Sequence, residues 1–362
     1  MSQPVTSRTV IRKSPAPRLG KCGLALSVAR ILRKTYCSQL IGLRFRGAGT
    51  IVRLHSVVPD PAEHLFDHTL TSTHFLDDYC AWLRHRKIDI LTLDQALARL
   101  HDPGANRFVV ITLDDGYADN LVHALPILER YNAPFTVYIA TCMIARQMDF
   151  WWAGLQKLFA VNTVVDFTPM EKRFACGTMA QKVAALHQVN TWVHADIPGR
   201  IPLVHKSLTA HNIDARALLD QQALTKCQLQ RLAAHRLVTI GAHSTSHVEL
   251  AKMDLAQATV DISKNRTFLE EITGRAVEHF AYPFGGAAAC GRREEDLVKG
   301  LGFKTAVTAR MGNLFSDHIE RPYALPRVGF AADKESMHYM AALMDGSVQL
   351  FANRRWAAVT TM

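Results

Sequence analysis

Short apolar runs alternate with amphipathic helical patterns along most of the chain. The runs at residues 50–58, 108–113 and 135–140 each fit a buried strand. Between them, residues 75–86 and 121–131 carry apolar side chains at helical spacing. Strands and helices that alternate at such short intervals predict parallel βαβ units in a sheet or barrel.

The pattern changes between about residues 150 and 236, where mixed helical stretches follow Trp151 and Trp152 and contain the breakers Pro198 and Pro202. This predicts a helical insertion or lid without a core of its own. Beyond it the alternation resumes, with strands expected at 237–243, 279–284 and 303–309 and a helix at 255–272.

The same pattern divides the chain into three parts: a basic arm at residues 1–48 with an amphipathic helix, a barrel at 49–335 and a C-terminal helix or tail at 336–362. Residues 1–59 hold eleven Lys and Arg and no acid, so the net charge of +10 lies almost entirely there. The helix permits peripheral membrane contact through residues 21–46. No nucleic-acid-binding module accompanies these charges, so we expect no nucleic acid partner.

The apolar patch at residues 23–29 is too short for a membrane span and poorly shaped for a signal peptide. We therefore expect a cytoplasmic protein, with membrane association left open. The seven cysteines are scattered and form no CxxC pair. This favours free thiols over a disulfide framework or a structural zinc site.

Two adjacent acids follow the strand at 108–113, in the stretch ITLDDGYADN. Successive strand residues point to opposite faces, so Asp114 and Asp115 share a site only if the chain turns there. Gly116 permits that turn because glycine readily adopts a positive φ. An ordinary Asp-Gly turn with a helix cap remains the alternative.

A second polar group, GAHSTSH, follows the strand expected at 237–243. The carboxyl ends of parallel strands form the functional rim in barrels and open α/β sheets. His243 and His247, four residues apart, together with one carboxylate make a three-ligand metal site that leaves a position open for water. This spacing alone is weak evidence in a chain with 17 histidines.

The ordered motifs TLDDG, HSTSH and YPFGG make residues 50–330 resemble the polysaccharide deacetylases, the family-4 carbohydrate esterases that include nodulation protein B. The resemblance implies a distorted (β/α)7-type barrel with a helical insertion. It also implies hydrolysis of N-acetyl groups with a divalent metal, zinc before cobalt, nickel or manganese. Asp115, His243 and His247 match the metal ligands, and Asp114 matches the general base.

The resemblance also suggests residues for the substrate side. In the family a tyrosine amide of the third motif stabilises the oxyanion, which here indicates Tyr282, with Pro283 and Phe284 in the same loop. Trp151 and Trp152 have rings that stack well on a sugar face. Packing inside the insertion is an equally good interpretation of these two residues.

Two departures from the family pattern require replacements. The arginine that usually steadies the base is missing, with Ala281 at its place, and Arg327 in ALPRVGF is the candidate substitute. The late histidine that usually serves as acid is also missing. The poly-N-acetylglucosamine deacetylases take their acid from the first strand instead, where this chain has His55.

The leading hypothesis is a metal-dependent hydrolase that removes N-acetyl groups from oligo- or polysaccharides containing N-acetylglucosamine. A non-catalytic sugar-binding relative of the same fold is the alternative, because the two family residues above are missing. A non-haem iron oxygenase is disfavoured, because βα alternation replaces the short strands of a double-sheet barrel.

Overall fold

The computed structural model of the protein describes residues 44–60, 69–102, 104, 106–329, 336–348 and 360. The predicted basic arm, with its helix and the proposed membrane contact at 21–46, lies outside the described residues up to residue 43. None of the described helices is long and apolar enough to cross a membrane.

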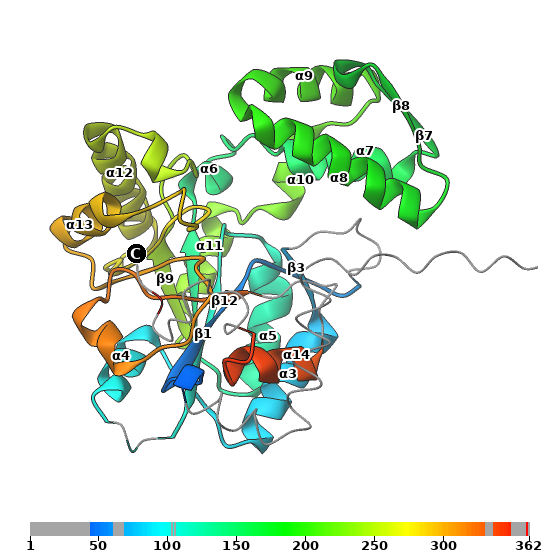
Figure 1. Ribbon diagram of the computed structural model, residues 1–362. Helices are drawn as coiled ribbons and strands as arrows, with labels where there is room; N and C mark the ends of the chain where they lie inside the picture. The colour runs from blue at the N-terminus through cyan, green and yellow to red at the C-terminus, as the bar shows by residue number, and fades with distance from the viewer. Residues whose placement is uncertain are drawn as a thin grey trace, which may run out of the picture.

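A parallel sheet forms the centre of the molecule (Figure 1). Its strands follow the order β11-β10-β9-β6-β5-β1-β12, and β4 pairs with β5 beside this path. A parallel bridge between Val307 and Leu325 connects the β11 edge to the segment that leads into β12. The sheet therefore curls round, and the predicted (β/α)7-type barrel is confirmed. The strands are β1 (Gly49–Leu54), β4 (Asp89–Ile90), β5 (Phe108–Leu113), β6 (Phe135–Ile139), β9 (Val238–Ala242), β10 (His279–Ala281), β11 (Thr305–Val307) and β12 (Val328–Gly329).

Alternate residues of each strand face two different apolar layers. In β5, Val109 and Ile111 belong to the large cluster between sheet and helices, whereas Phe108 and Val110 belong to the cluster inside the barrel. All six residues of β5 are buried. This two-sided burial explains why the strand reads as an unbroken apolar run.

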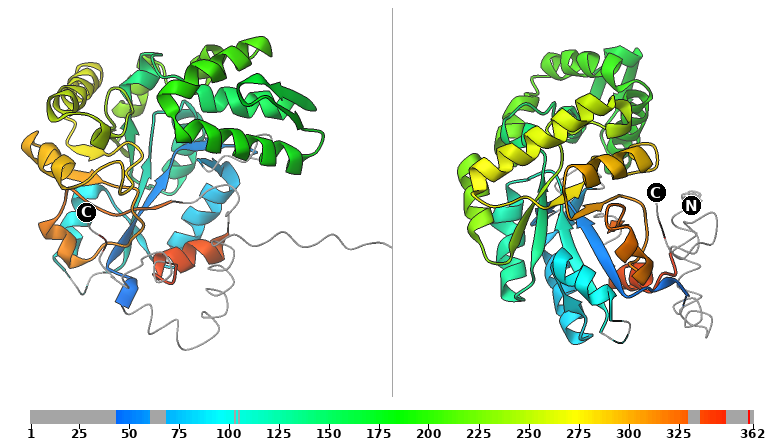
Figure 2. Two further views of the ribbon diagram at one scale, coloured as in Figure 1. Left: turned by 45° about the horizontal axis from the view of Figure 1, so that its top comes forward. Right: turned by 90° about the vertical axis from the view of Figure 1, so that its left-hand side faces the viewer.

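Helices surround the sheet (Figure 2). They are α3 (Thr73–His85), α4 (Leu93–Leu100), α5 (Leu125–Arg130), α6 (Thr141–Ile144), α11 (Lys226–Ala234), α12 (Leu255–Thr273), α13 (Arg292–Gly300) and α14 (Met337–Met344). The longest, α12, begins at a capping box formed by Asp254 and Gln257 and ends at Gly274 with a φ of 65°. These local signals fix its length, as the sequence pattern indicated.

The first predicted strand is interrupted. Residues 50–58 form β1 and then β2 (Ser56–Val58), with His55 between them outside either strand. β2 leaves the barrel sheet and pairs with β3 (Leu70–Ser72) in a separate sheet. The helix expected at 121–131 likewise starts as a π-helix, η2 (Asn120–Ala124), before α5 continues.

The insertion has its own core, contrary to the prediction. It contains α7 (Trp151–Val161), the hairpin of β7 (Val164–Phe167) and β8 (Lys172–Ala175), α8 (Met179–Ala195), α9 (Ile197–Ala210) and α10 (Ala215–Gln222). Leu155, Phe159 and Val189 are completely buried in an apolar cluster that these elements form among themselves. Helix α11 packs into the barrel cluster instead, so this separate core ends before the predicted boundary at residue 236.

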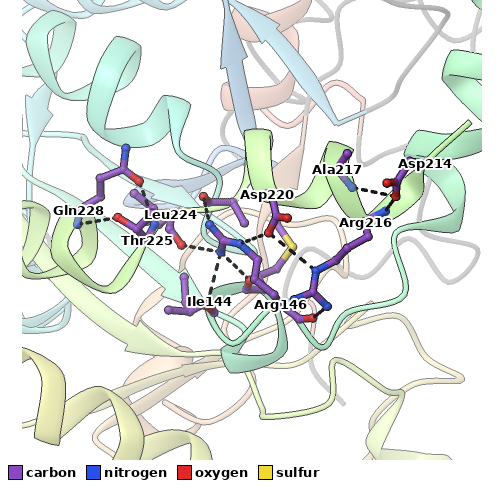
Figure 3. Close-up of polar contacts among 11 residues, drawn as sticks. Ile144, Arg146, Asp214, Arg216, Ala217, Asp220, Leu224, Thr225 and Gln228 are labelled. Atoms are coloured by element: carbon purple, nitrogen blue, oxygen red, sulfur yellow. Dashed lines mark hydrogen bonds and ion pairs between the residues drawn. The ribbon is translucent and has the colours of Figure 1, made fainter.

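The chain that returns from the insertion is bonded to the loop after β5. Leu224 N donates to Gly116 O at 3.0 Å, and Ala118 N donates to Gln222 O at 2.7 Å. Arg146 reinforces this return, because its guanidinium donates to Leu224 O at 2.8 Å and to three other carbonyls and pairs with Asp220 (Figure 3). The insertion is thus attached directly beside the two adjacent acids.

Candidate active site

The backbone turn after β5 brings the two acids to one side. Asp114 N still continues the strand ladder by donating to Leu54 O at 3.0 Å. Asp115 then has a φ of 77° and Gly116 a φ of 97°. A positive φ is costly for aspartate and marks a residue that its surroundings hold in place. The predicted turn is present, and it begins one residue before the glycine.

Three side chains converge at this edge of the sheet. Asp115 Oδ1 lies 3.2 Å from His247 Nε2 and 3.5 Å from His243 Nε2. One ligand atom from each residue lies within 4.8 Å of the other two. Asp115 and His243 are buried, and His247 is half-buried. The three residues predicted as ligands are therefore close enough to hold one ion.

The hydrogen bonding of His243 fits a metal ligand. Its Nδ1–H donates to Ala281 O at 2.7 Å, which leaves Nε2 as the unprotonated atom that faces Asp115. A backbone carbonyl behind a ligating imidazole is a common arrangement that fixes the ring and its tautomer. Two imidazoles and one carboxylate suit zinc and neighbouring transition metals. The donor set thus fits the divalent ion that the resemblance implies.

Helix α12 supports both histidines. Asn265 is completely buried, accepts from His243 N at 3.0 Å and donates to Ile139 O at 3.0 Å. One turn earlier, Asp261 accepts from the backbone N–H groups of Thr245 and Ser246 at 2.9 and 3.0 Å. Sequence reasoning missed these two residues. The signal for Asn265 was a polar side chain in the apolar stripe of the helix, with Ile262 and Leu269 at helical spacing.

The second acid forms a buried ion pair with Arg327. The guanidinium donates to both carboxylate oxygens of Asp114 at 2.7 Å, and its Nε donates to Thr308 O at 2.8 Å. Thr112 Oγ1 accepts a further bond at 3.1 Å. Both members of the pair are only 2% exposed. The predicted contact between Arg327 and Asp114 is present, in the bidentate form that fixes a carboxylate most firmly.

The charges near the two acids oppose the effect of burial. Burial would raise the pKa of Asp114, but Arg327 and His243 hold it below its usual value. Burial likewise acts to raise the pKa of Asp115, and the neighbouring side chains of His243 and His247 bring it well below the usual value. Both carboxylates are therefore ionised at neutral pH, as a metal ligand and a general base must be.

His55 lies at the same end of the barrel, directly after β1. β1 pairs with β12, so His55 follows the strand beside the Arg327 segment, as predicted. The carboxylates of Asp115 and Asp114 act on its charge and raise its pKa, but burial is the larger effect and lowers the pKa below its usual value. The imidazole is therefore neutral in the free site at pH 7.

Tyr282, the predicted oxyanion donor, uses its backbone N–H within the sheet. Tyr282 N donates to Val307 O at 3.2 Å and so belongs to the ladder between β10 and β11. The Tyr282 side chain is also occupied, since its hydroxyl donates to Tyr323 O at 2.9 Å. Pro283 has no N–H and is buried. Phe284 differs, because it is 48% exposed and its ring lies 5.2 Å from the ring of His247.

The two tryptophans belong to the insertion. Trp151 is only 8% exposed and lies in the separate core, with its ring 5.7 Å from that of His194. It has no free face for a sugar, so packing is the correct interpretation. Trp152 is half-buried and packs edge-on against Phe150 at 4.9 Å. Neither residue is part of the group of polar side chains at the strand ends.

Comparison of the sequence with protein-family models identifies the family of this chain. A family model described as polysaccharide deacetylase matches residues 101–166 and 184–305, which is just over half of the chain. The chain belongs to the polysaccharide deacetylase family. The matched segments of this chain contain both acids and both histidines. No curated protein matches its sequence.

Several solved structures share the fold of this chain. The deacetylase PplD of Streptococcus pyogenes, in complex with acetate, is 14% identical with a TM-score of 0.54, over 81% of this chain and 97% of that one. IcaB from Ammonifex degensii is 16% identical with a TM-score of 0.53, over 82% and 97%. A de-N-acetylase from Aggregatibacter actinomycetemcomitans is 14% identical with a TM-score of 0.51, over 82% and 99%.

Proposed function

We propose that this deacetylase removes N-acetyl groups from oligo- or polysaccharides that contain N-acetylglucosamine, with a divalent ion held by Asp115, His243 and His247. The observation that carries this proposal is the position of the Asp114–Arg327 pair directly beside the three ligands. When bound, a divalent ion polarises the acetyl carbonyl and makes water a nucleophile near neutral pH, since it lowers the pKa of water to about 7. Zinc suits the donor set best.

Asp114 is the proposed base. In the reaction a water oxygen bonds to the acetyl carbon, and Asp114 accepts the proton that this water loses. Each carboxylate oxygen already accepts one bond from Arg327 but has a further lone pair available. Arg327 keeps the carboxylate ionised and aimed, so its proposed role is to position Asp114.

His55 is the proposed acid. The bond between the acetyl carbon and the nitrogen breaks, and His55 gives its proton to the departing amine, so that acetate and a free amino sugar leave. Because the pKa of His55 is lowered in the free site, this role requires the imidazole to gain its proton as substrate binds. A first-strand histidine supports the poly-N-acetylglucosamine type among the deacetylases.

Substrate class follows from the same site. Among the structures of similar fold, one is described as a de-N-acetylase and another holds acetate. Phe284 is the aromatic side chain with an accessible ring beside a proposed ligand, which suits stacking on a sugar face. A non-catalytic sugar-binding relative is not favoured, because a binding module has no use for a buried base held by two charge-assisted hydrogen bonds.

The test is acetate release from N-acetylglucosamine oligomers by the purified protein, with zinc, cobalt, nickel or manganese and with a chelator. We expect zinc-dependent release that the chelator abolishes. His55→Ala should lower kcat by about 10²- to 10⁴-fold while bound zinc stays constant. His187→Ala changes an exposed histidine of α8 and serves as the control. Zinc binding without acetate release would contradict the hydrolase and favour the binding module.

A further inference from the structure

The break between β1 and β2 is built around His55. Each neighbour of His55 in residues 54–57 is bonded to the segment 114–120 that contains the acids. Leu54 O accepts from Asp114 N at 3.0 Å, so the ladder is regular up to that point. Beyond Leu54 the backbone partners from the β5 segment are replaced by two side chains, those of Asp119 and Asn120, while β2 pairs with β3.

Asn120 binds the backbone of His55 itself. Its Nδ2 donates to His55 O at 2.8 Å and to Asp119 Oδ1 at 2.9 Å. Both of these partners are acceptors, which determines the orientation of the Asn120 amide. A rotated amide would place its Oδ1 against the oxygens of His55 and Asp119. Asn120 is completely buried, and its Oδ1 has no partner among the described residues.

Asp119 holds the residues that follow. Its Oδ2 accepts from Ser56 Oγ at 2.5 Å, and the Val57 N–H also bonds to this carboxylate. His55, Ser56 and Val57 therefore each have one group bonded to the Asp119–Asn120 pair. An ordinary parallel neighbour would instead continue the ladder and keep the strand straight. The pair takes the place of that neighbour and turns the strand at His55.

We propose that Asp119 and Asn120 are positioning residues that hold the His55 imidazole at the mouth of the barrel. This inference rests on the proposed role of His55 and adds residues to that site. A shift of about 1 Å in a catalytic group can cost about 10²-fold in rate. The first half of the DDGYADN stretch thus supplies the ligand and the base, and its second half places the acid.

The other end of β1 offers a matched control. Asn313 is also completely buried, accepts from Thr50 Oγ1 at 2.7 Å and donates to Phe45 O at 3.1 Å. It fastens the amino end of the same strand, whereas Asn120 fastens the carboxyl end. Asn313→Ala and Asn120→Ala therefore remove the same kind of side chain from the two ends of β1. Asn120 lies at the end near the site, and Asn313 lies at the end away from it.

The experiment measures kcat, KM and bound zinc for Asn120→Ala, Asn313→Ala and wild-type enzyme. We expect Asn120→Ala to lower kcat about 10- to 100-fold with KM and zinc content unchanged. Asn313→Ala should lower the melting temperature but change kcat by less than about twofold. If Asn120→Ala fails to fold, Asn120→Asp keeps the volume but loses the donor, and Ser56→Ala removes a single bond to Asp119.

A double-mutant cycle separates positioning from general destabilisation. In a His55→Ala background, Asn120→Ala should lower kcat by less than about twofold, because no imidazole remains to be positioned. An undiminished loss in that background would overturn the proposal.

The His55 ring resonances in the NMR spectrum of the zinc-loaded protein give a readout that does not depend on turnover. They should shift in Asn120→Ala and stay in place in Asn313→Ala. If His55→Ala is fully active, the acid role fails, but the shift still tests the positioning contact. Unchanged resonances in Asn120→Ala would reject the positioning contact whatever the activity.

Discussion

The mouth of the barrel and the helical insertion bury their side chains in opposite ways. At the mouth, Asp114, Arg327 and His243 are almost completely buried, and each has charged or hydrogen-bonding partners. The insertion buries an apolar cluster that includes Leu155 and Phe159. Burial of apolar groups stabilises by itself, whereas a buried charge is tolerated only with its partner. The stability of the barrel mouth therefore depends on particular pairs of polar side chains. The stability of the insertion depends on the total volume of buried apolar side chains.

Backbone strain follows the same division. Asp115, Ser244, His247 and Phe284 all have a positive φ, and all four lie at the mouth. In the insertion, Glu171 and Asn212 have a positive φ, and they lie at the turn between β7 and β8 and in the connection from α9 to α10. Strain of this kind costs about 1 to 3 kcal/mol per residue and persists only where surrounding contacts enforce it. The contacts from α12 and Asp114–Arg327 provide that enforcement at the mouth.

The largest expected effect is loss of a ligand. His247→Ala should remove most of the bound zinc and lower kcat/KM by roughly 10³-fold or more, since a metal contributes several kcal/mol to the transition state. The fold should persist, because His247 is half-buried. Metal analysis and circular dichroism check this, with His187→Ala as control. Full zinc content in His247→Ala would contradict the site.

Breaking the buried pair should damage both rate and stability. Arg327→Met leaves Asp114 buried without its partner, which we expect to cost about 3 to 5 kcal/mol in free energy of unfolding. The same change should lower kcat at least about 10²-fold, because the base is neither ionised nor aimed. Arg327→Lys should recover part of the stability but little of the rate, since a single ammonium cannot donate in the bidentate geometry. Denaturant unfolding and steady-state kinetics measure the two effects.

A cavity in the insertion should separate stability from chemistry. Trp151→Ala is expected to destabilise the insertion by about 3 to 5 kcal/mol, the usual cost of removing a buried tryptophan. Zinc content and kcat at low temperature should stay within about twofold of the wild-type values. Trp152→Ala, at a half-buried position, should cost less. A rise in KM specific to Trp151→Ala would mean that this ring contacts the sugar after all.

The smallest expected effect is a pH dependence that originates at the mouth. Burial raises the pKa of Asp119 to about 7, whereas an aspartate in an unfolded chain titrates near about 3.9. Between these values the folded protein binds a proton that the unfolded chain has released. The contribution of Asp119 to the free energy of unfolding is therefore complete below about pH 4 and is lost as pH rises through about 7.

Asp119→Asn cannot titrate, so its stability relative to wild-type protein should improve from pH 5 to about pH 7 and level off above that. Urea unfolding of both proteins across this range measures the difference. Any constant effect of the lost carboxylate cancels in the comparison between pH values. A difference that does not change with pH would show that Asp119 is ionised throughout.

The positions of residues at the ends of parallel strands could be predicted from the sequence. Asp115, His243 and His247 meet because parallel strands end at one edge, and Arg327 lies on the strand segment that closes next to β1. The strand ends indicated that the ligands meet, and the resemblance to the deacetylase family supplied the pairing of Arg327 with Asp114. The fold class followed from the same alternation of strands and helices.

Other parts of the site and the insertion are determined by contacts between residues far apart in the sequence, which a local sequence pattern does not reveal. Whether the Tyr282 amide is free depends on the register of β10 and β11, where Val307 O accepts from it. The break at His55 is caused by Asn120, 65 residues further along the chain. Trp151 was ambiguous because an aromatic ring serves a core and a sugar site equally well. In each case the deciding partner lies far away in the sequence.

The attachment of the insertion limits how this protein can be recombined with its relatives. Arg146 holds Leu224 (Figure 3), and backbone bonds at Gly116 and Ala118 hold residues 222–224 against the loop that carries the acids. A chimaera that exchanges residues 151–221 keeps these bonds, whereas one with its second junction after residue 224 replaces the segment to which Gly116 and Ala118 are bonded. The second junction of a working chimaera is therefore set by the hydrogen bonds of the loop that carries the acids. It lies before α11, one helix earlier than the end of the insertion predicted at residue 236.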